Sequence, residues 1–175
     1  MIMEKMFSIP FVGLKEGKHQ FNYRVDNTFF ESRPYDEILG AQVIVHVDFV
    51  KKSTLLELDF CAKGDLNVTC DLTNEPYNEP IEASLNLIVK FGDFFNDENE
   101  EVLIIPHSEH ELKIDQFIFE MLVLAIPAKK THPGIADGTL QSDILDKLEE
   151  LQPKENNNSQ DTDPRWSKLK DLLDN

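Results

Sequence analysis

Apolar and polar side chains alternate in several runs through the first half of the chain. A period of two is typical of strands that bury one face, and the β-branched content of residues 41–50 supports this interpretation. Short polar turns separate the runs, and no helix-length crossover intervenes, so we expect a mainly antiparallel sheet. Gly64 is expected to end one strand and begin the next. The runs are 21–25, 41–50, 54–62, 65–71 and 81–91.

Helical periodicity is found in fewer places. Residues 115–126 have the broadest apolar face, with Asp115 placed to cap the first turn and Pro127 placed to end the helix. A shorter helix is expected either after Asp26 or near residues 35–39. Strands and helices together predict an α+β fold, and the pattern leaves open whether the sheet closes into a barrel.

The chain divides into four segments by composition. Residues 1–133 form the expected α+β core domain, and residues 134–152 form an amphipathic helical segment. Residues 153–162 are rich in Asn, Gln, Ser and Asp, which predicts a flexible polar linker. Residues 163–175 follow as a short C-terminal amphipathic helix, with Pro164 at its first position.

Residues 93–115 are strongly acidic. Eight carboxylates in this stretch are accompanied by a single basic residue, Lys113, which predicts an acidic loop. The apolar run 102–106 lies inside it and ends in Pro106. Since proline is tolerated at the edge of a sheet, this run predicts an edge strand.

The whole chain carries 17 Lys and Arg against 33 Asp and Glu, a formal net charge of −16. Such a field repels polyanions and disfavours unassisted nucleic-acid binding, whereas it attracts basic proteins. No run approaches the roughly 18 to 20 apolar residues that cross a bilayer, and residues 1–7 lack a signal-peptide pattern. We therefore expect a cytoplasmic protein, in which Cys61 and Cys70 do not form a disulfide.

No recognised catalytic spacing is present. The seven glycines form neither a phosphate-binding loop nor a dinucleotide fingerprint, and there is no Gly-x-Ser-x-Gly elbow. Zinc sites usually contain close cysteine pairs, which the candidate ligands here lack. We expect no enzyme activity, no catalytic residue, no metal and no cofactor. The candidate ligands are Cys61, Cys70, His107 and His110, with His46 and His132 as additional histidines.

Two basic doublets, Lys51-Lys52 and Lys129-Lys130, are the densest positive charges in the chain. If the fold brought them together with His132, they would form a small patch able to contact a few phosphates. Arg165 would extend it. Direct RNA binding through this Lys/His/Arg set is therefore an alternative function.

Three segments resemble the YceD family of large ribosomal RNA subunit accumulation proteins. Residues 64–91 contain a cysteine-bearing turn followed by a Glu-Pro-aromatic step. Residues 114–127 are similar to the family's acidic-capped helix that ends in Leu-x-Leu-x-x-Pro, with His132 following. Residues 163–172 are similar to the family's C-terminal motif. The family-motif residues are Cys70, Glu75, Pro76, Glu120 and Pro127.

One position departs from the resemblance. Many members carry a second cysteine three residues after the first, where this chain has Thr73. If the cysteine pair binds metal or reacts in relatives, this chain is not expected to do so.

The resemblance implies a role in the accumulation of large-subunit (23S) ribosomal RNA and in ribosome assembly, and it implies no reaction. Our hypothesis is a non-catalytic factor that binds a ribosomal particle or a basic ribosomal protein, with the acidic loop as counter-surface and the terminal helix as anchor. That helix could instead pack on its own domain, and the oligomeric state stays open. The partner-binding candidates are Pro164, Arg165, Trp166, Leu169, Lys129, Lys130 and His132.

Overall fold

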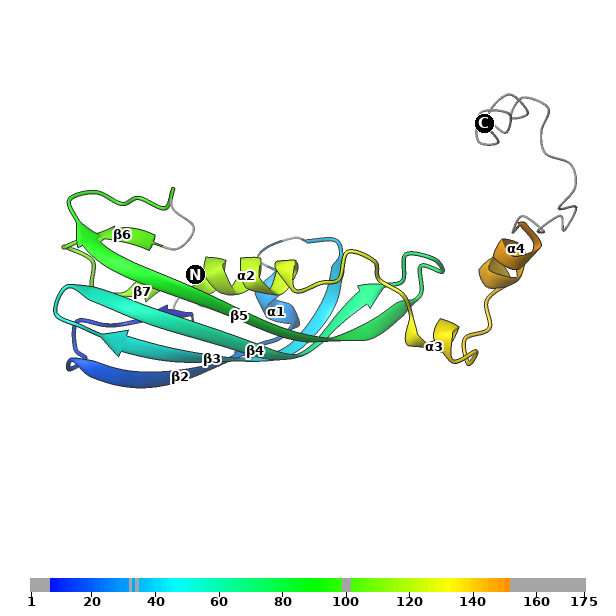
Figure 1. The fold of residues 1–175 in the computed structure, drawn as a ribbon, viewed down its shortest axis with the longest axis horizontal. Coiled ribbons are helices and arrows are strands. Elements are labelled where there is room, and N and C mark those ends of the chain that lie inside the picture. The colour runs from blue at the N-terminus through cyan, green and yellow to red at the C-terminus, as the bar shows by residue number, and fades with distance from the viewer. Residues whose placement is uncertain (1–6, 32, 34, 99–101, 152–175) are drawn as a thin grey trace, which may run out of the picture. The chain divides into compact units, whose positions relative to one another are not determined.

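The computed structural model describes residues 7–31, 33, 35–98 and 102–151. It contains two compact units, Met1–Leu140 and Gln141–Asn175. No helix in the described part of the chain has both the length and the apolar character needed to cross a membrane. The elements, in chain order, are β1 Ser8–Ile9, β2 Gly17–Val25, α1 Asn27–Glu31, β3 Ile38–Lys51, β4 Leu55–Thr69, β5 Pro76–Gly92, β6 Val102–Pro106, β7 Leu112–Lys113, α2 Asp115–Leu124, α3 Pro133–Ala136 and α4 Asp143–Leu151 (Figure 1).

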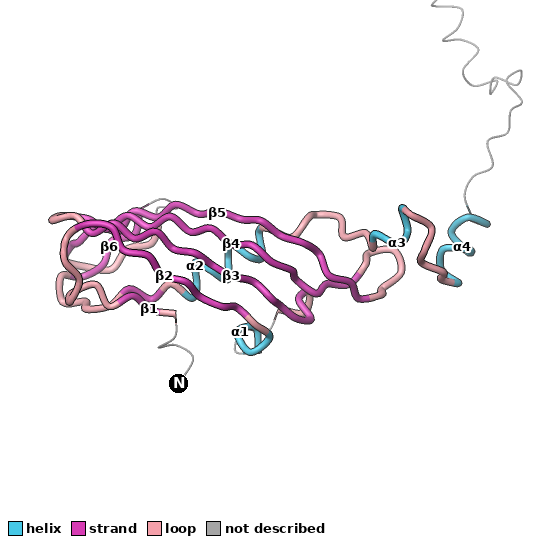
Figure 2. The backbone as a smooth tube through the Cα atoms, turned by 90° about the horizontal axis from the view of Figure 1, so that it is seen from below, coloured by secondary structure: helices cyan, strands magenta, loops and turns pink. Residues whose placement is uncertain are grey.

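A five-stranded sheet dominates the first unit, in the order β2-β3-β4-β5-β6 (Figure 2). Its first three pairs are antiparallel, as predicted, but β6 runs parallel to β5. The sheet is therefore mixed. Among the described residues β2 and β6 are its two edges and do not pair, so no closed barrel is found. The predicted edge strand at 102–106 is confirmed as β6.

The expectation that Gly64 separates two strands is wrong, because β4 runs through it without interruption. Gly64 has φ +154°, and a Cβ atom there would lie 2.2 Å from the backbone oxygen of Gln42 and 2.7 Å from Cα of Val43. Only glycine allows β3 and β4 to approach this closely. The residue that would interrupt an isolated strand therefore lets the two long strands stay paired.

The core lies on the inner face of the sheet, where the alternation predicted it. Val43, Val45 and Val47 of β3 are fully buried or nearly so. Helix α2 covers part of this face with Ile118, Met121 and Leu122. The predicted helix 115–126 is thus confirmed in type and position, although it ends at Leu124.

The first turns of α1 and α2 differ in how an aspartate contributes to them. Asp115 does not cap α2 as predicted. It is the first helical residue, and it pairs with Arg33. The short helix after Asp26 is confirmed as α1, with the Asp26 carboxylate accepting a bond from the Thr28 amide at 3.1 Å. No helix forms at residues 35–39.

In the second unit, α4 lies within the predicted amphipathic segment, and none of its residues is buried. The short helix α3, in the first unit, overlaps the start of that predicted segment. The expected linker 153–162 and C-terminal helix 163–175 lie outside the described residues.

Candidate functional site

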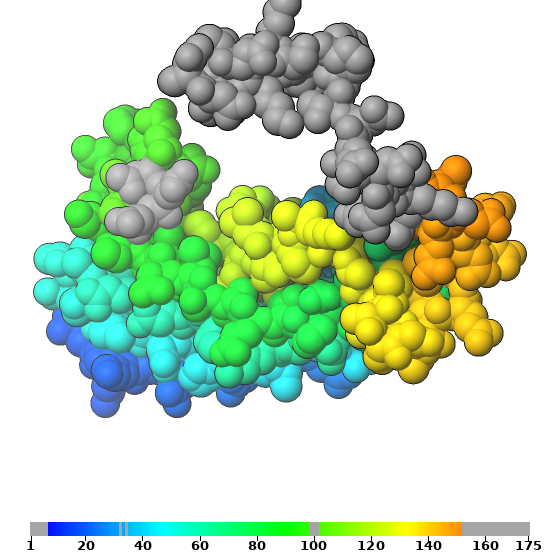
Figure 3. Space-filling model, turned by 45° about the vertical axis from the view of Figure 1, so that its right-hand side comes forward, coloured from blue at the N-terminus to red at the C-terminus, as the bar shows by residue number. Residues whose placement is uncertain are grey.

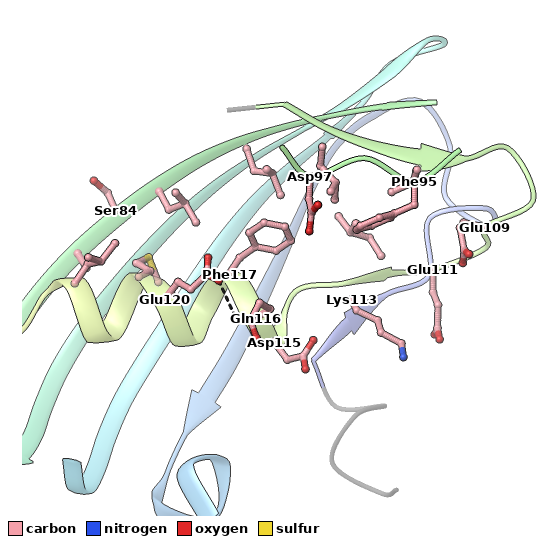
Figure 4. Close-up of a pocket in the computed structure, with 18 of the residues that line it drawn as sticks. Ser84, Phe95, Asp97, Glu109, Glu111, Lys113, Asp115, Gln116, Phe117 and Glu120 are labelled. Carbon is pink, nitrogen blue, oxygen red and sulfur yellow. Dashed lines mark hydrogen bonds between the residues drawn. The ribbon is translucent and has the colours of Figure 1, made fainter. Parts of the chain in front are cut away.

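A groove of about 1210 Å³ opens between β5, β6, α2 and the connection from β6 to β7 (Figure 4). It exists because α2 is shorter than the strands that it covers, so the inward side chains Ala83 and Leu85 are only half-buried. In the space-filling view the end of α2 and the residues after it (yellow) lie against β5 (green) (Figure 3). The apolar lining consists of Ala83, Leu85, Leu87, Phe95, Leu103, Ile105, Leu112, Phe117, Met121, Leu124 and Ala125.

Several of these apolar side chains face water. Leu124 is 83% exposed and Phe95 is 60% exposed. Phe95, from the connection between β5 and β6, and Phe117, from α2, reach into the groove from different elements (Figure 4). Single exposed apolar residues are common, but a contiguous set around one concavity marks a surface that another molecule covers.

The rim of this groove is acidic. Lys113 is its one basic lining residue, against six carboxylates. Two carboxylates are neutralised, since Asp115 pairs with Arg33 and Glu82 pairs with Lys63 at 2.7 Å. The six are Glu82, Asp97, Glu109, Glu111, Asp115 and Glu120.

The other four carboxylates have no ion-pair partner within the described residues. Glu111 accepts a hydrogen bond from the Ser8 hydroxyl at 3.2 Å, and Glu120 accepts one from the Gln116 amide at 2.6 Å. Both bonds leave the charge uncompensated. An apolar floor with a surplus of negative charge on its rim suits a ligand that is apolar and cationic. We call this surface the acid-rimmed groove.

A second region gathers the residues that carry the family resemblance. Residues 70–75, the motif turn, close the hairpin between β4 and β5. The Cys70 amide donates to the Glu75 carbonyl at 2.9 Å, and the Asn74 amide donates to the Cys70 carbonyl at 2.9 Å, with Asn74 at φ 57°. Thr73 is buried, and its Oγ1 accepts from the Glu75 amide at 3.4 Å. Threonine therefore closes this turn through hydrogen bonds.

Residues 129–132, the strap, follow α2 and bind the motif turn. The Asp71 amide donates to the Lys130 carbonyl at 2.9 Å, and the Lys130 amide donates back to the Asp71 carboxylate at 2.7 Å. The His132 amide donates to Cys70 Sγ at 3.4 Å. The His132 ring packs on Tyr77, with centroids 5.4 Å apart. Two segments of the resemblance, far apart in sequence, thus form one structure.

The surroundings of Cys70 favour its thiolate. Burial raises the pKa of the thiol, but hydrogen bonds from the Thr73 hydroxyl and from the backbone amides of His132, Leu72 and Thr73 outweigh it and hold this pKa below its usual value. Burial, with a smaller contribution from Glu79, raises the pKa of the neighbouring Tyr77 phenol. Cys70 has no exposed surface, so these bonds fix the turn and do not present a nucleophile.

The two basic doublets do not come together. Lys51 ends β3 and Lys52 begins the turn that leads to β4 at Leu55, whereas Lys130 binds Asp71, just after β4 ends. Fourteen strand steps of ~3.3 Å place the doublets ~46 Å apart. The combined phosphate-binding patch considered from the sequence is therefore not formed.

Most of these lysines also have partners within the chain. Lys51 Nζ donates to the carbonyls of Phe11 and Leu14, each at 2.8 Å. Lys52 pairs with Glu57. Lys130 Nζ lies 2.8 Å from Glu37 Oε2 and 3.5 Å from Asp71 Oδ1.

The scattered His and Cys residues occupy separate environments. Cys61 pairs in register with His46 on the outer face of the sheet, whereas Cys70 is buried in the motif turn. The His107 ring stacks on Phe91, with centroids 5.8 Å apart. Within the described ranges no group of three or more potential ligands gathers to hold a metal ion.

Sequence reasoning found the acidic segment of the groove but missed its apolar floor. The available signals were two adjacent phenylalanines, Phe94 and Phe95, within acidic surroundings, and the unusually broad apolar face of α2. Of the partner-binding candidates, Lys129, Lys130 and His132 lie in the strap. Pro164, Arg165, Trp166 and Leu169 lie outside the described residues.

Comparison with known proteins supports the resemblance. No curated protein and no solved structure matches the chain. One family model, described as large ribosomal RNA subunit accumulation protein YceD, matches residues 58–173. The match covers about two thirds of the chain and includes most of β4, all of β5, the acid-rimmed groove, the motif turn and the strap. The chain belongs to the YceD family, whose name ties it to the accumulation of large-subunit ribosomal RNA.

Proposed function

We propose that the chain supports the accumulation of large-subunit ribosomal RNA by binding a basic ribosomal protein, or a particle that exposes one, in the acid-rimmed groove. It does so without catalysis. The observation that carries the proposal is a set of four carboxylates, without ion-pair partners in the described structure, on the rim of an apolar groove that exposes Phe95 and Leu124. The four are Asp97, Glu109, Glu111 and Glu120.

Charge and apolar area contribute differently to such binding. The net charge of −16 attracts basic proteins at long range, which raises the association rate and weakens with salt. Specificity and residence time come from the floor, where Phe95 and Leu124 lose contact with water. A partner with both Lys/Arg and apolar side chains uses both contributions, whereas RNA is repelled by the rim.

Two earlier expectations remain predictions beside this proposal. The segment from Pro164 to Leu169, with Arg165 and Trp166, is proposed to anchor the same partner. Direct RNA binding is the alternative, and the ion pairs of Lys52 and Lys130 argue against it.

The test uses purified large-subunit ribosomal proteins, freed of RNA and passed over the immobilised full chain at low and moderate salt. Bound proteins are identified by mass spectrometry. The groove variant is Glu109→Lys with Glu111→Lys. The control is Glu16→Lys with Asp59→Lys, which changes net charge equally at two exposed positions outside the groove.

We expect one or a few basic ribosomal proteins to be retained by the wild type and by the control. The groove variant should bind them at least tenfold more weakly, about 1.4 kcal/mol. An equal loss of binding in both variants would show that net charge alone, and not the groove, causes the effect. If the wild type retained no ribosomal protein, the proposal would be wrong.

A further inference from the structure

We infer that the partner segment enters the groove in extended form, as an additional strand on the free edge of β5. The inference rests on the proposed function, because it specifies how the basic partner occupies the same groove. It begins from the unequal lengths of neighbouring strands. β4 pairs with β5 along residues 76–90, whereas β6 pairs only with residues 88–92. In the described structure, residues 76–87 of β5 therefore have a strand on one side only.

Two prolines show which backbone groups face the open side. Pro76 and Pro80 lie in register with Thr69 and Asp65, and the ladder between β4 and β5 has no bulge. Proline cannot donate to a ladder, so these positions direct their nitrogen away from β4. Because orientation alternates along a strand, the even-numbered residues of β5 face the open edge.

The pairing with β6 gives the same assignment independently. The Ile104 amide donates to the Asn96 carbonyl at 2.8 Å, and the Asn96 amide donates to the Ile104 carbonyl at 3.0 Å. Ile104 therefore faces away from β5. In a parallel pair the opposite residue, Lys90, then directs its amide and carbonyl toward β6.

The open edge consequently presents the backbone amides and carbonyls of Glu82, Ser84 and Asn86. None of these backbone groups has a hydrogen-bond partner on that side in the described part of the chain. Glu82, Ala83, Ser84 and Leu85 all line the groove, so both faces of this stretch border it. An unpaired edge beside an apolar surface is a template for strand addition.

The side chains along this edge define the chemistry of the added strand. On the inner face it would meet Leu85 and, from α2, Phe117 and Met121. On the outer face it would lie beside Glu82, which is already paired with Lys63 at 2.7 Å. A strand of about five or six residues with apolar side chains inward and basic side chains outward would place its cations in water beside this ion pair, under the attraction of the groove's other four carboxylates. A second copy of this chain fits less well, because it carries the same charge of −16 and would place carboxylates against this edge.

The experiment measures binding of three synthetic peptides to the full chain by fluorescence anisotropy. One peptide alternates Lys and Val. The second contains the same residues in separate Lys and Val blocks. The third is the alternating peptide N-methylated at every second amide, prepared in both registers so that one form or the other blocks the edge that faces β5.

On the protein side, Ser84→Pro removes the donor at the centre of the edge and leaves the ladder with β4 intact, as Pro80 does. Asn78→Pro is the control, because it has the same orientation on β5 but does not line the groove. Circular dichroism and thermal unfolding confirm that both variants fold. Amide hydrogen exchange adds a direct readout at residues 82, 84 and 86.

We expect the alternating peptide to bind at least tenfold more tightly than the block peptide, and Ser84→Pro or one N-methylation register to remove this advantage. Binding should protect the three even-numbered amides from exchange. If Ser84→Pro has no effect while the groove charge reversal still weakens binding, strand addition is overturned and the proposed function stands. If no basic peptide binds the wild type, both fail. Edge-to-edge dimers in sedimentation would instead assign the edge of β5 to a second copy of this chain. Tighter peptide binding after reversing the charges of Arg165, Lys168 and Lys170 would assign the edge to the chain's own C-terminal segment.

Discussion

The acid-rimmed groove and the motif turn are the two polar regions that distinguish this chain, and they differ in whether their polar groups are satisfied. In the motif turn and the strap that binds it, the Cys70 sulfur, the Asp71 carboxylate and the Lys130 ammonium all have partners within the chain. In the groove, four of the six carboxylates have no ion-pair partner among the described residues, and Phe95 and Leu124 are exposed. Groups that satisfy one another stabilise a fold, whereas groups left unsatisfied at an apolar surface are available to a partner.

The motif turn therefore serves to hold the hairpin and the strap, even though it carries much of the resemblance to the family. A residue that typifies a family need not touch its partner.

Tyr77→Ala should cause the largest loss, because it removes a buried ring that packs on His132 beside the motif turn. Truncation of a buried aromatic residue costs roughly 3 to 5 kcal/mol of unfolding free energy. Urea unfolding measures this loss, with Tyr77→Phe as the control that keeps the ring. If the Tyr77→Ala protein were as stable as the wild type but failed to bind basic partners, the motif turn would be part of the binding surface. The contrast between a stabilising turn and a binding groove would then be wrong.

Phe95→Ser combined with Leu124→Ser should leave stability nearly unchanged but weaken partner binding. Both side chains are largely exposed, so the unfolding free energy should change by no more than about 0.5 kcal/mol for each. Binding of the basic partner should weaken roughly tenfold, because the apolar contact is lost. Calorimetric titration measures the affinity.

Ile44→Ser serves as the matched control for this pair, since Ile44 is 63% exposed but does not line the groove. It should bind as the wild type does. Equal weakening by Ile44→Ser would show that the effect is not local to the groove.

Thr73→Val should raise the pKa of the Cys70 thiol, because the hydroxyl that favours the thiolate is removed while burial remains. Ultraviolet thiolate absorbance against pH, in a Cys61→Ser background, reports this titration. Partner affinity should stay unchanged. An unshifted titration would show that the backbone amides alone set the pKa.

The smallest effect is expected from pH acting on the strap. The amide and ammonium of Lys130 lower the pKa of the Asp71 carboxyl, so this stabilisation is present above the unfolded value near 3.8 and is lost as pH falls through the lower folded value. Glu37 and Asp71 raise the pKa of Lys130, so its contribution is present below 10.5 and is lost as pH rises through the higher folded value.

Between these limits neither the Asp71 contribution nor the Lys130 contribution should change with pH. Urea midpoints of the wild type and Asp71→Asn, compared across the acid range, test this expectation. The acid-dependent part of the difference should disappear in the variant. If the urea midpoints of the wild type and Asp71→Asn depended on pH in the same way, Asp71 would not contribute to acid-sensitive stability.

Local patterns predicted much of the fold. Alternation located the inward faces of β3 and β4, and helical periodicity located α2. Pro106 correctly indicated an edge strand. These features depend on residues near one another in sequence, which is why they can be inferred without the structure.

The remaining features depend on distant contacts. From the sequence, Gly64 is expected to interrupt a strand. Its actual role depends on β3, because a Cβ atom at this position would lie 2.2 Å from the backbone oxygen of Gln42. The parallel direction of β6 helps to create the groove and has no local signal, whereas the length of α2 followed from Asp115 and Pro127. The separation of the two basic doublets likewise follows from the length of β4, which was predicted as two shorter strands.

The most direct test of the central claim, that the groove recognises the partner while the motif turn stabilises the fold, is complementation in cells whose own copy of the gene has been deleted. The ratio of large- to small-subunit ribosomal RNA is measured after expression of each variant at equal protein level. We predict that Glu109→Lys with Glu111→Lys fails to restore this ratio, whereas Glu16→Lys with Asp59→Lys and the folded Cys70→Ser variant restore it. Full restoration by the groove variant, with failure of Cys70→Ser, would contradict the account.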